Sequence, residues 1–226
     1  MFITWIFIFY NELIKYINKL MENFCKTYNV SRETHSKLEL YCQSLPEWQQ
    51  KFNLVSNASL SDAWNRHFAD SAQLFDLIPA NAKTLLDMGS GAGFPGMVLA
   101  IMAEEKTPYL KVTLAESIAK KTLYLNHVKE ITATDVKILN IRVENIKGRF
   151  DVITARAVTG LSDLLKYAFP LLSRGGICIF PKGKTAEEEI SSAKTKWNFD
   201  FESVPSKTSD EGQILIIRNL VEKRRK

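Results

Sequence analysis

The chain has 226 residues, enough for one α/β domain with an appended segment and short for two full domains. Hydrophobic residues make up 46% and charged residues 24% of the chain, which excludes a disordered or fibrous protein. The formal net charge of +5 fits a nucleic-acid partner but does not require one, because many basic proteins simply carry solvated lysines and arginines.

The cysteines and histidines are isolated from one another. The chain has three of each, without a CxxC pair and without a cluster of histidines: Cys25, Cys42, Cys178, His35, His67 and His127. This pattern argues against a disulfide framework and a structural zinc site. It predicts a protein without a metal in a reduced, cytoplasmic compartment.

Residues 1–10 (MFITWIFIFY) are almost wholly apolar. Ten residues are too few to span a bilayer, which needs about 20, and the basic segment and cleavage site of a signal peptide are missing. Three interpretations stay open: a helix that packs on the body, a contact with a membrane surface, or an over-extended start with Met21 as the true initiator. We favour packing, so we expect no membrane partner.

Residues 11–78 show only helical periodicity. A first helix has one apolar face, formed by Leu13, Ile14, Ile17, Leu20, Met21 and Phe24. A second begins after Ser31 as N-cap and buries Leu38, Tyr41, Leu45 and Trp48, with Pro46 as a candidate kink. A third opens at Ser59 or Ser61 and turns Leu60, Trp64, Phe68, Ala72 and Phe75 inward. Residues 1–78 are therefore expected to form a helical segment.

Beyond Pro79, short β-rich runs alternate with helical stretches. The expected strands are 83–88, 109–115, 136–139, 150–155, 176–180, 199–204 and 213–218, and the expected helices are 95–103, 118–130, 161–172 and 185–194. Such alternation requires parallel strands with crossover helices on both faces, and the closing pair of strands suggests an antiparallel edge. Residues 79–226 are thus predicted to be an α/β domain of Rossmann-like type.

A glycine-rich loop follows the first of these strands, in residues 84–96 (TLLDMGSGAGFPG). Gly89, Gly91 and Gly93 let the backbone turn sharply and approach a ligand closely, and Pro95 is suited to the first helical turn. The helix N-terminus then presents free N–H groups and a partial positive charge. The GxGxG spacing differs from the GxGxxG of dinucleotide-binding proteins and is weak evidence by itself.

Two acidic residues narrow the choice of ligand. Glu116 ends the next strand, where a carboxylate can bind both ribose hydroxyls of an adenosine. NAD and S-adenosylmethionine share that ribose. Asp87 lies at the tip of the first strand, a poor place beside a pyrophosphate and a good one beside the ammonium and sulfonium groups of S-adenosylmethionine. We therefore favour S-adenosylmethionine over NAD, and either cofactor over a plain tight turn.

The sequence at this point resembles the RsmG family, also called glucose-inhibited division protein B. The resemblance covers residues 48–218 and rests on several motifs in order: Trp48 with 51–56 (KFNLVS), 66–71 (RHFADS), 87–96 (DMGSGAGFPG), 116–117 (ES) with Lys120 and Lys121, 142–144 (RVE), 154–157 (TARA) and 182–183 (KG). The family often has Asp where this chain has Glu116, and either carboxylate can hold a ribose. The apolar leader before Asn11 is not part of the family pattern.

The resemblance implies a cytoplasmic methyltransferase that uses S-adenosylmethionine to methylate N7 of a guanine in 16S ribosomal RNA, free or in a precursor of the small ribosomal subunit. It also implies that Gly89 and Phe94 line the cofactor pocket, that Val143 and Glu144 meet the adenine, and that Arg156 contacts the cofactor. Together with the residues above, the expected cofactor set is Asp87, Gly89, Gly91, Gly93, Phe94, Glu116, Val143, Glu144 and Arg156. We expect a monomer.

Three residues are candidates for the reaction itself. Arg156 follows the strand 150–155 at the edge where ligands bind in open α/β sheets, and it could grip a carboxylate in bidentate fashion. Lys182 follows a later strand at the same edge and could meet an RNA phosphate or the target base. His67 is expected on a helix face as a contact on the substrate side, by the resemblance more than by its position.

The candidate chemistry needs no general base, because guanine N7 has a lone pair and no proton to lose. Alignment of the reacting atoms and a site arranged for the shifting charge are sufficient. The sequence has no Pro-Cys pair for attack on cytosine C5, and residues 155–158 (ARAV) replace the Asn/Asp-Pro-Pro-aromatic motif of exocyclic-amine methyltransferases. Methylation of another RNA or a small molecule, an NAD-dependent oxidoreductase and a non-enzymatic RNA-binding protein remain as alternatives.

Overall fold

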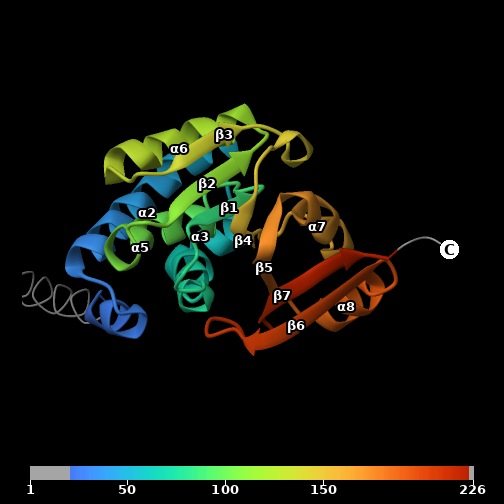
Figure 1. Cartoon of the computed structure of the whole chain (residues 1–226). Coiled ribbons are helices and arrows are strands. Elements are labelled where there is room, and N and C mark those ends of the chain that lie inside the picture. The colour runs from blue at the N-terminus through green and yellow to red at the C-terminus, as the bar shows by residue number, and fades with distance from the viewer. Residues whose placement is uncertain (1–20, 224–226) are drawn as a thin grey trace, which may run out of the picture.

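The computed structural model describes residues 21–223, so the predictions for residues 1–20 lie outside it. Seven strands form one sheet in the order β3-β2-β1-β4-β5-β7-β6 (Figure 1). They are β1 Thr84–Met88, β2 Lys111–Glu116, β3 Lys137–Asn140, β4 Phe150–Thr154, β5 Leu172–Lys182, β6 Trp197–Pro205 and β7 Gln213–Glu222. The first five pair in parallel, and β7 pairs antiparallel with both β5 and β6. The predicted Rossmann-like sheet with an antiparallel edge is confirmed.

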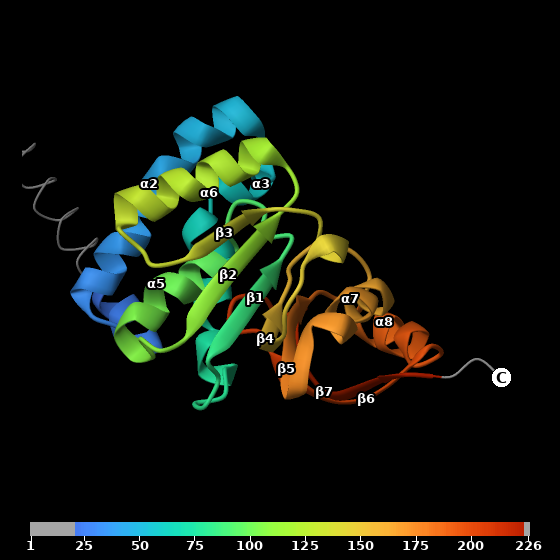
Figure 2. The same cartoon turned by 45° about the horizontal axis from the view of Figure 1, so that its top comes forward.

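Successive side chains of the central strands point to opposite faces of the sheet and enter two separate hydrophobic clusters. Leu85 of β1 enters one cluster and Leu86 the other, as do Ile177 and Cys178 of β5. The helices α2 Arg32–Phe52, α5 Gly96–Lys106 and α6 Ala119–Thr132 cover one face, and α7 Leu161–Ala168 and α8 Ala186–Ala193 cover the other (Figure 2). The central strands β1, β2 and β4 are therefore mostly buried on both faces, whereas the edge strands β3 and β6 are largely uncovered.

The N-cap of α2 is Ser31, as predicted, because its hydroxyl accepts a hydrogen bond of 3.2 Å from the amide of Thr34. The helix continues through Pro46 to Phe52 and ends at Asn53, which has a φ of 48°. Its buried face carries Leu38, Tyr41 and Leu45. These residues share a hydrophobic cluster with β1 and α5, so the described part of the first segment packs directly on the sheet. The division at residue 78 stays a prediction.

The third predicted helix is broken into four pieces, and its predicted start was wrong. They are α3 Asn57–Leu60, the π-helix Trp64–Ala69 (η1), α4 Asp70–Ala72 and a 3₁₀ turn Phe75–Leu77 (η2). Ser56 caps α3, because its hydroxyl accepts from the amide of Ser59 at 3.3 Å. The prediction of which residues face inward is confirmed: Phe68, Ala72 and Phe75 are buried, and Leu60 and Trp64 pack against the same hydrophobic cluster.

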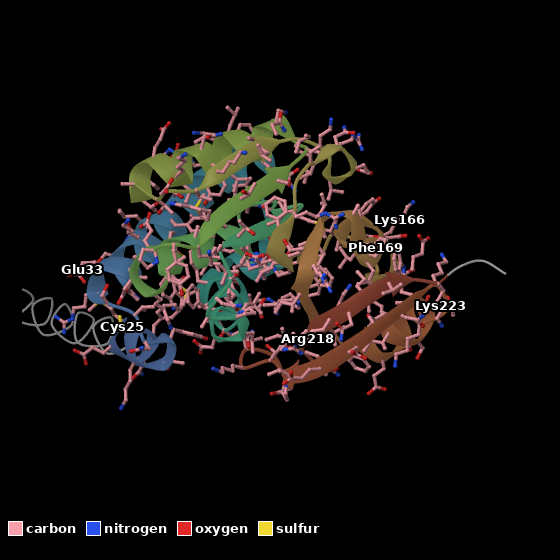
Figure 3. The ribbon with its side chains drawn as sticks, viewed as in Figure 1. Cys25, Glu33, Lys166, Phe169, Arg218 and Lys223 are labelled. Carbon is pink, nitrogen blue, oxygen red and sulfur yellow. The ribbon has the colours of Figure 1, made fainter. Side chains whose placement is uncertain are left out.

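The helix expected over 161–172 ends at Ala168, where α7 gives way to a 3₁₀ turn, Phe169–Leu171 (η4). Pro170 has no N–H to continue the α-helical ladder, which accounts for the earlier end. In Figure 3, Phe169 lies with Lys166 and Lys223 at the end of the molecule opposite Cys25. β5 also begins earlier than expected, at Leu172, because its pairing with β4 shifts between Phe150 and Val152 and leaves several residues of β5 unpaired there.

Candidate active site

The glycine loop joins β1 to α5 along the carboxyl edge of the parallel strands. Gly89, Gly91 and Gly93 all have positive φ, at 66°, 58° and 104°, which is the region that favours glycine. A Cβ on Gly89 would stand 2.7 Å from the Val158 side chain, whereas a Cβ on Gly91 would point into open space, with nothing nearer than 3.9 Å. Gly91 therefore lets the backbone itself form the floor of a hollow.

Asp87 lies near the end of β1, two residues before the first glycine of this loop. It is fully buried, and its two carboxylate oxygens accept from the Gly96 amide at 3.1 Å and from the Thr154 hydroxyl at 2.9 Å. Burial raises the pKa of Asp87 to about 6. Asp87 is absent from the lining of the cleft described below, so its contact with the ammonium and sulfonium groups stays a prediction. Within the protein, Asp87 ties the first residue of α5 to β4.

Glu116 ends β2 and forms the opposite wall. Its side chain is 5% exposed, and its two oxygens accept from the amides of Gly91 at 2.8 Å and Ile118 at 2.7 Å. Each carboxylate oxygen has a second lone pair that can accept a further hydrogen bond. Glu116 thus fixes the loop and keeps acceptor capacity for a pair of hydroxyls, as a ribose would offer.

The cleft between these walls has a volume of about 690 Å³, within the usual range for a small-molecule site. It is lined by Leu54, Val55, Ser56, Ser59, Arg66, His67, Asp70, Gly89, Ser90, Gly91, Ala92, Phe94, Glu116, Ser117, Ile118, Lys121, Arg156, Ala157 and Val158. Of the predicted set, it brings together Gly89, Gly91, Phe94, Glu116, Arg156 and His67. An open glycine floor facing a carboxylate with spare acceptors fits the adenosine part of S-adenosylmethionine.

Val143 and Glu144 lie in a 3₁₀ turn, Val143–Asn145 (η3), after β3. They line a different hollow, with Lys147, Arg149 and Tyr167 among its other residues. Their contact with adenine stays a prediction from the resemblance. Gly93 is also absent from the lining of the cleft, since its missing Cβ faces the Tyr41 hydroxyl on α2.

Arg156 and His67 meet between β4 and the π-helix. One terminal nitrogen of Arg156 contacts Nδ1 of His67 at 2.9 Å, and Nε2 of His67 contacts the Ser59 hydroxyl at 2.9 Å. Because a guanidinium can only donate, Nδ1 must accept, so the imidazole proton lies on Nε2 and is donated to Ser59. Burial and the nearby Arg156 lower the pKa of His67 to about 4. The ring is therefore neutral, and its lone pair is already in use.

Phe94 and Asp70 complete this cluster. The imidazole of His67 stacks on the Phe94 ring with centroids 4.8 Å apart, and the Arg156 guanidinium lies 5.2 Å from the same ring centre. The other terminal nitrogen of Arg156 donates to Oδ2 of Asp70 at 3.1 Å and to the carbonyl of Arg66 at 2.9 Å. π-Helical turns are frequent at functional sites; sequence periodicity gave no signal for this one.

A second pocket of about 490 Å³ adjoins the cleft and shares Asp70, Arg156, Ala157 and Val158 with it. Its other walls are the ends of β4 and β5 and the turn between β6 and β7. Lys182 lines this pocket, with its ammonium 2.7 Å from a carboxylate oxygen of Glu189. Ala157, between the two hollows, has a φ of 53°, a strained value for a residue with a Cβ and of a kind that gathers at functional sites.

Within residues 21–223, no group of three or more His, Cys, Asp or Glu side chains is placed to hold a metal ion. Over the same residues, no helix combines the length and the apolar character needed to cross a bilayer.

Solved structures share this architecture. The ribosomal protein L11 methylase of Lactobacillus delbrueckii subsp. bulgaricus aligns with a TM-score of 0.53 at 15% identity, over 68% of this chain and 77% of that chain. The tRNA (m1A58) methyltransferase TrmI of Aquifex aeolicus aligns with a TM-score of 0.52 at 15% identity, over 69% of each chain. At these identities, the likeness establishes the fold of S-adenosylmethionine-dependent methyltransferases.

Sequence relatives are much closer. A ribosomal RNA small subunit methyltransferase G from Paramagnetospirillum magneticum is 44% identical over 192 residues, 84% of this chain and 91% of the relative. One from a Methylobacterium species is 43% identical over 194 residues, with the same coverage. The family model GidB, described as rRNA small subunit methyltransferase G, matches residues 34–218. The chain therefore belongs to the GidB family of rRNA small subunit methyltransferases.

Proposed function

We propose that this protein methylates N7 of a guanine in 16S ribosomal RNA and acts in the cytoplasm as a monomer on the RNA or on a precursor of the small subunit. S-adenosylmethionine is the methyl donor. The observation that carries the proposal is the cleft between Gly91 and Glu116, which opens beside a second pocket at the ends of β4 and β5. The names of the relatives point to the same class of substrate.

When bound, S-adenosylmethionine supplies an electrophilic methyl group on a positively charged sulfur. In our assignment, Glu116 accepts from the ribose hydroxyls, and the Gly91 backbone lies under the nucleoside. Arg156 lines both pockets. This supports a role in which its guanidinium binds the carboxylate of the methyl donor on one side and orients the acceptor nucleotide on the other.

Proton transfer is not required of any residue here. Guanine N7 attacks through its own lone pair, so the protein must only hold donor and acceptor in line. The contacts of His67 agree with a reaction that needs no general base, because Nδ1 of the imidazole already accepts a hydrogen bond from Arg156. His67 is thus a positioning group for Arg156 and not a base.

Two other methylation chemistries require residues that the site does not present. Attack on cytosine C5 needs a cysteine thiolate, but Cys178 is fully buried within β5, and burial raises the pKa of its thiol. The segment after β4 presents Arg156 and Val158 in place of the Pro-Pro-aromatic pattern of exocyclic-amine methyltransferases. The target base must leave its stack to reach the pocket, and the second pocket offers a wall of backbone and small side chains for it.

The test is methyl transfer from labelled S-adenosylmethionine to ribosomal RNA of a strain that lacks this protein. We expect label in 16S RNA, at a single guanine that becomes sensitive to the cleavage chemistry of N7-methylguanine. RNA from the parent strain, already modified, should accept no label. Transfer only to another RNA or to a small molecule would contradict the proposal and favour the corresponding alternative.

A further inference from the structure

The turn between β6 and β7, residues 206–212, is fastened to the helical segment that precedes β1. Oε1 of Gln73 accepts a 2.8 Å hydrogen bond from the backbone amide of Lys207, and Nε2 of Gln73 donates to the Ser206 hydroxyl at 3.1 Å. The Thr208 hydroxyl donates to Oδ1 of Asp70 at 2.9 Å. Figure 1 shows the end of the β6–β7 hairpin beside the helical segment before β1. Two parts of the chain about 130 residues apart are thus joined by polar contacts.

The partners on the helical side are largely covered from water. Gln73 is 3% exposed, and Asp70 is largely covered, with 19% of its side chain exposed. Nε2 of Gln73 also donates to Oδ1 of Asp70 at 2.9 Å, so the amide orders the carboxylate as well as the turn. Hydrogen bonds in such a setting are costly to lose, because a buried polar partner stays unpaired.

The turn has one further contact with the body, between the Lys207 ammonium and the Tyr28 ring, whose centre is 6.0 Å away. Its own backbone bonds close it upon itself, from the Ser206 amide to the Gly212 carbonyl at 2.9 Å and from the Gly212 amide to the Ser209 carbonyl at 3.1 Å. None of residues 206–212 is buried. A surface turn without apolar anchors is free to move unless polar contacts fix it. Its hydrogen bonds to the body are those with Gln73 and Asp70, so its place there depends chiefly on these two residues.

The same turn is a wall of the second pocket. Ser206, Ser209 and Gly212 line it, opposite Arg156. Asp70 connects the two walls, because its Oδ1 accepts a hydrogen bond from Thr208 of the turn and its Oδ2 accepts one from Arg156. Gln73 itself lines neither pocket.

We propose that Gln73, together with Asp70, is a latch that holds the turn 206–212 in place as a wall of the pocket for the acceptor nucleotide. Gln73 is then a positioning residue for RNA and has no part in binding the methyl donor. This inference rests on the proposed function, which assigns the second pocket to the RNA.

The test compares Gln73→Met, which keeps the length of the side chain and removes its polar atoms, with Gln50→Met, the same change at an exposed position of α2. Three quantities are measured on each folded protein: amide hydrogen exchange at Lys207, the Kd for S-adenosylmethionine, and KM and kcat with 16S RNA. For Gln73→Met we expect exchange at Lys207 to quicken and KM for RNA to rise by roughly fivefold to tenfold, the worth of one buried hydrogen bond. The Kd for the donor should stay within twofold, and Gln50→Met should match the unaltered protein.

A second variant, Gln73→Glu, guards against misfolding of the first. It keeps the acceptor for the Lys207 amide and replaces the donor with a carboxylate beside Asp70, so we expect KM for RNA to rise again. Unchanged exchange at Lys207 in Gln73→Met would refute the latch. Faster exchange with unchanged KM would refute the turn as a wall of the acceptor pocket. Failure of the unaltered protein to methylate RNA would instead refute the proposed function, whatever the exchange shows.

Discussion

Gly91 and Glu116 together determine the shape of the glycine loop and the space above it. The amide of Gly91 donates to the Glu116 carboxylate, which shapes the loop, and the lack of a side chain on Gly91 leaves the space above it open. A glycine between two others and an acid one strand later are visible in the sequence, so this part of the site was predictable. The placing of Asp87 was not, because its partners Gly96 and Thr154 come together only when β1, β4 and α5 pack.

Replacement of Gly91 by arginine should abolish binding of the methyl donor, because the side chain would project into the cleft from its floor. Gly175→Arg is a matched control: Gly175 also has a positive φ, 76°, and open space where a Cβ would stand, but it lies away from the cleft. Both variants carry similar backbone strain, so only the first should lose affinity in calorimetric titration. Equal affinities would show that the donor does not lie on Gly91.

Glu116→Ala should weaken binding of S-adenosylmethionine by about 1–3 kcal/mol, the usual loss for a charged hydrogen-bond acceptor. The change removes the acceptor for the ribose and also frees the Gly91 and Ile118 amides. Glu130→Ala, at an exposed position of α6, should leave the Kd unchanged. A loss for Glu116→Ala no larger than that of the control would move the ribose site elsewhere.

The π-helix η1 is the element that could not be predicted from the sequence. Its apolar spacing is ordinary, and the expected inward face is the one observed. The π-helix is joined to a residue that is distant in sequence: Arg156, after β4, contacts the Arg66 carbonyl, His67 and Asp70. Helix and strand types could be predicted from periodicity alone, whereas contacts with a residue some 90 positions later leave no mark on the local pattern.

The contact between His67 and Arg156 should affect how the free energy of unfolding depends on pH. The pKa of His67 is about 4 in the folded protein and 6.5 ordinarily, so between these values the unfolded chain takes up the proton first. The contribution of His67 to the free energy of unfolding is therefore complete above pH 6.5 and declines as the pH falls toward 4. Asp87, with its pKa raised to about 6, acts in the opposite direction over much of this range, so the unaltered protein alone would not reveal it.

The comparison with His67→Gln isolates the effect. We expect the difference in unfolding free energy between the unaltered protein and this variant to shrink by about 1–3 kcal/mol from pH 7.5 to pH 4.5, from the size of the pKa change. Urea denaturation at several pH values measures it. A difference that is constant with pH would mean that His67 titrates alike in the folded and unfolded protein.

The molecule as a whole gathers its site along one edge of the sheet. Parallel pairing of the first five strands follows from the alternation of strand and helix, and parallel strands end at one edge of the sheet, so the sequence predicted the edge on which Glu116, Arg156 and Lys182 lie. It did not predict the second pocket. One wall of that pocket is the β6–β7 turn, held against the helical segment by Gln73, and no local pattern marks a glutamine as a partner for a turn about 130 residues away.

The central claim is that the cleft between the glycine loop and the end of β2 seats the methyl donor. A crystal structure of the protein with S-adenosylmethionine tests it most directly. The account predicts the ribose hydroxyls within hydrogen-bond distance of the Glu116 carboxylate, the nucleoside against Gly91, and the methyl group directed toward the pocket that Arg156 shares. Density for the donor in another hollow, or a cleft filled by side chains in the presence of saturating donor, would contradict it.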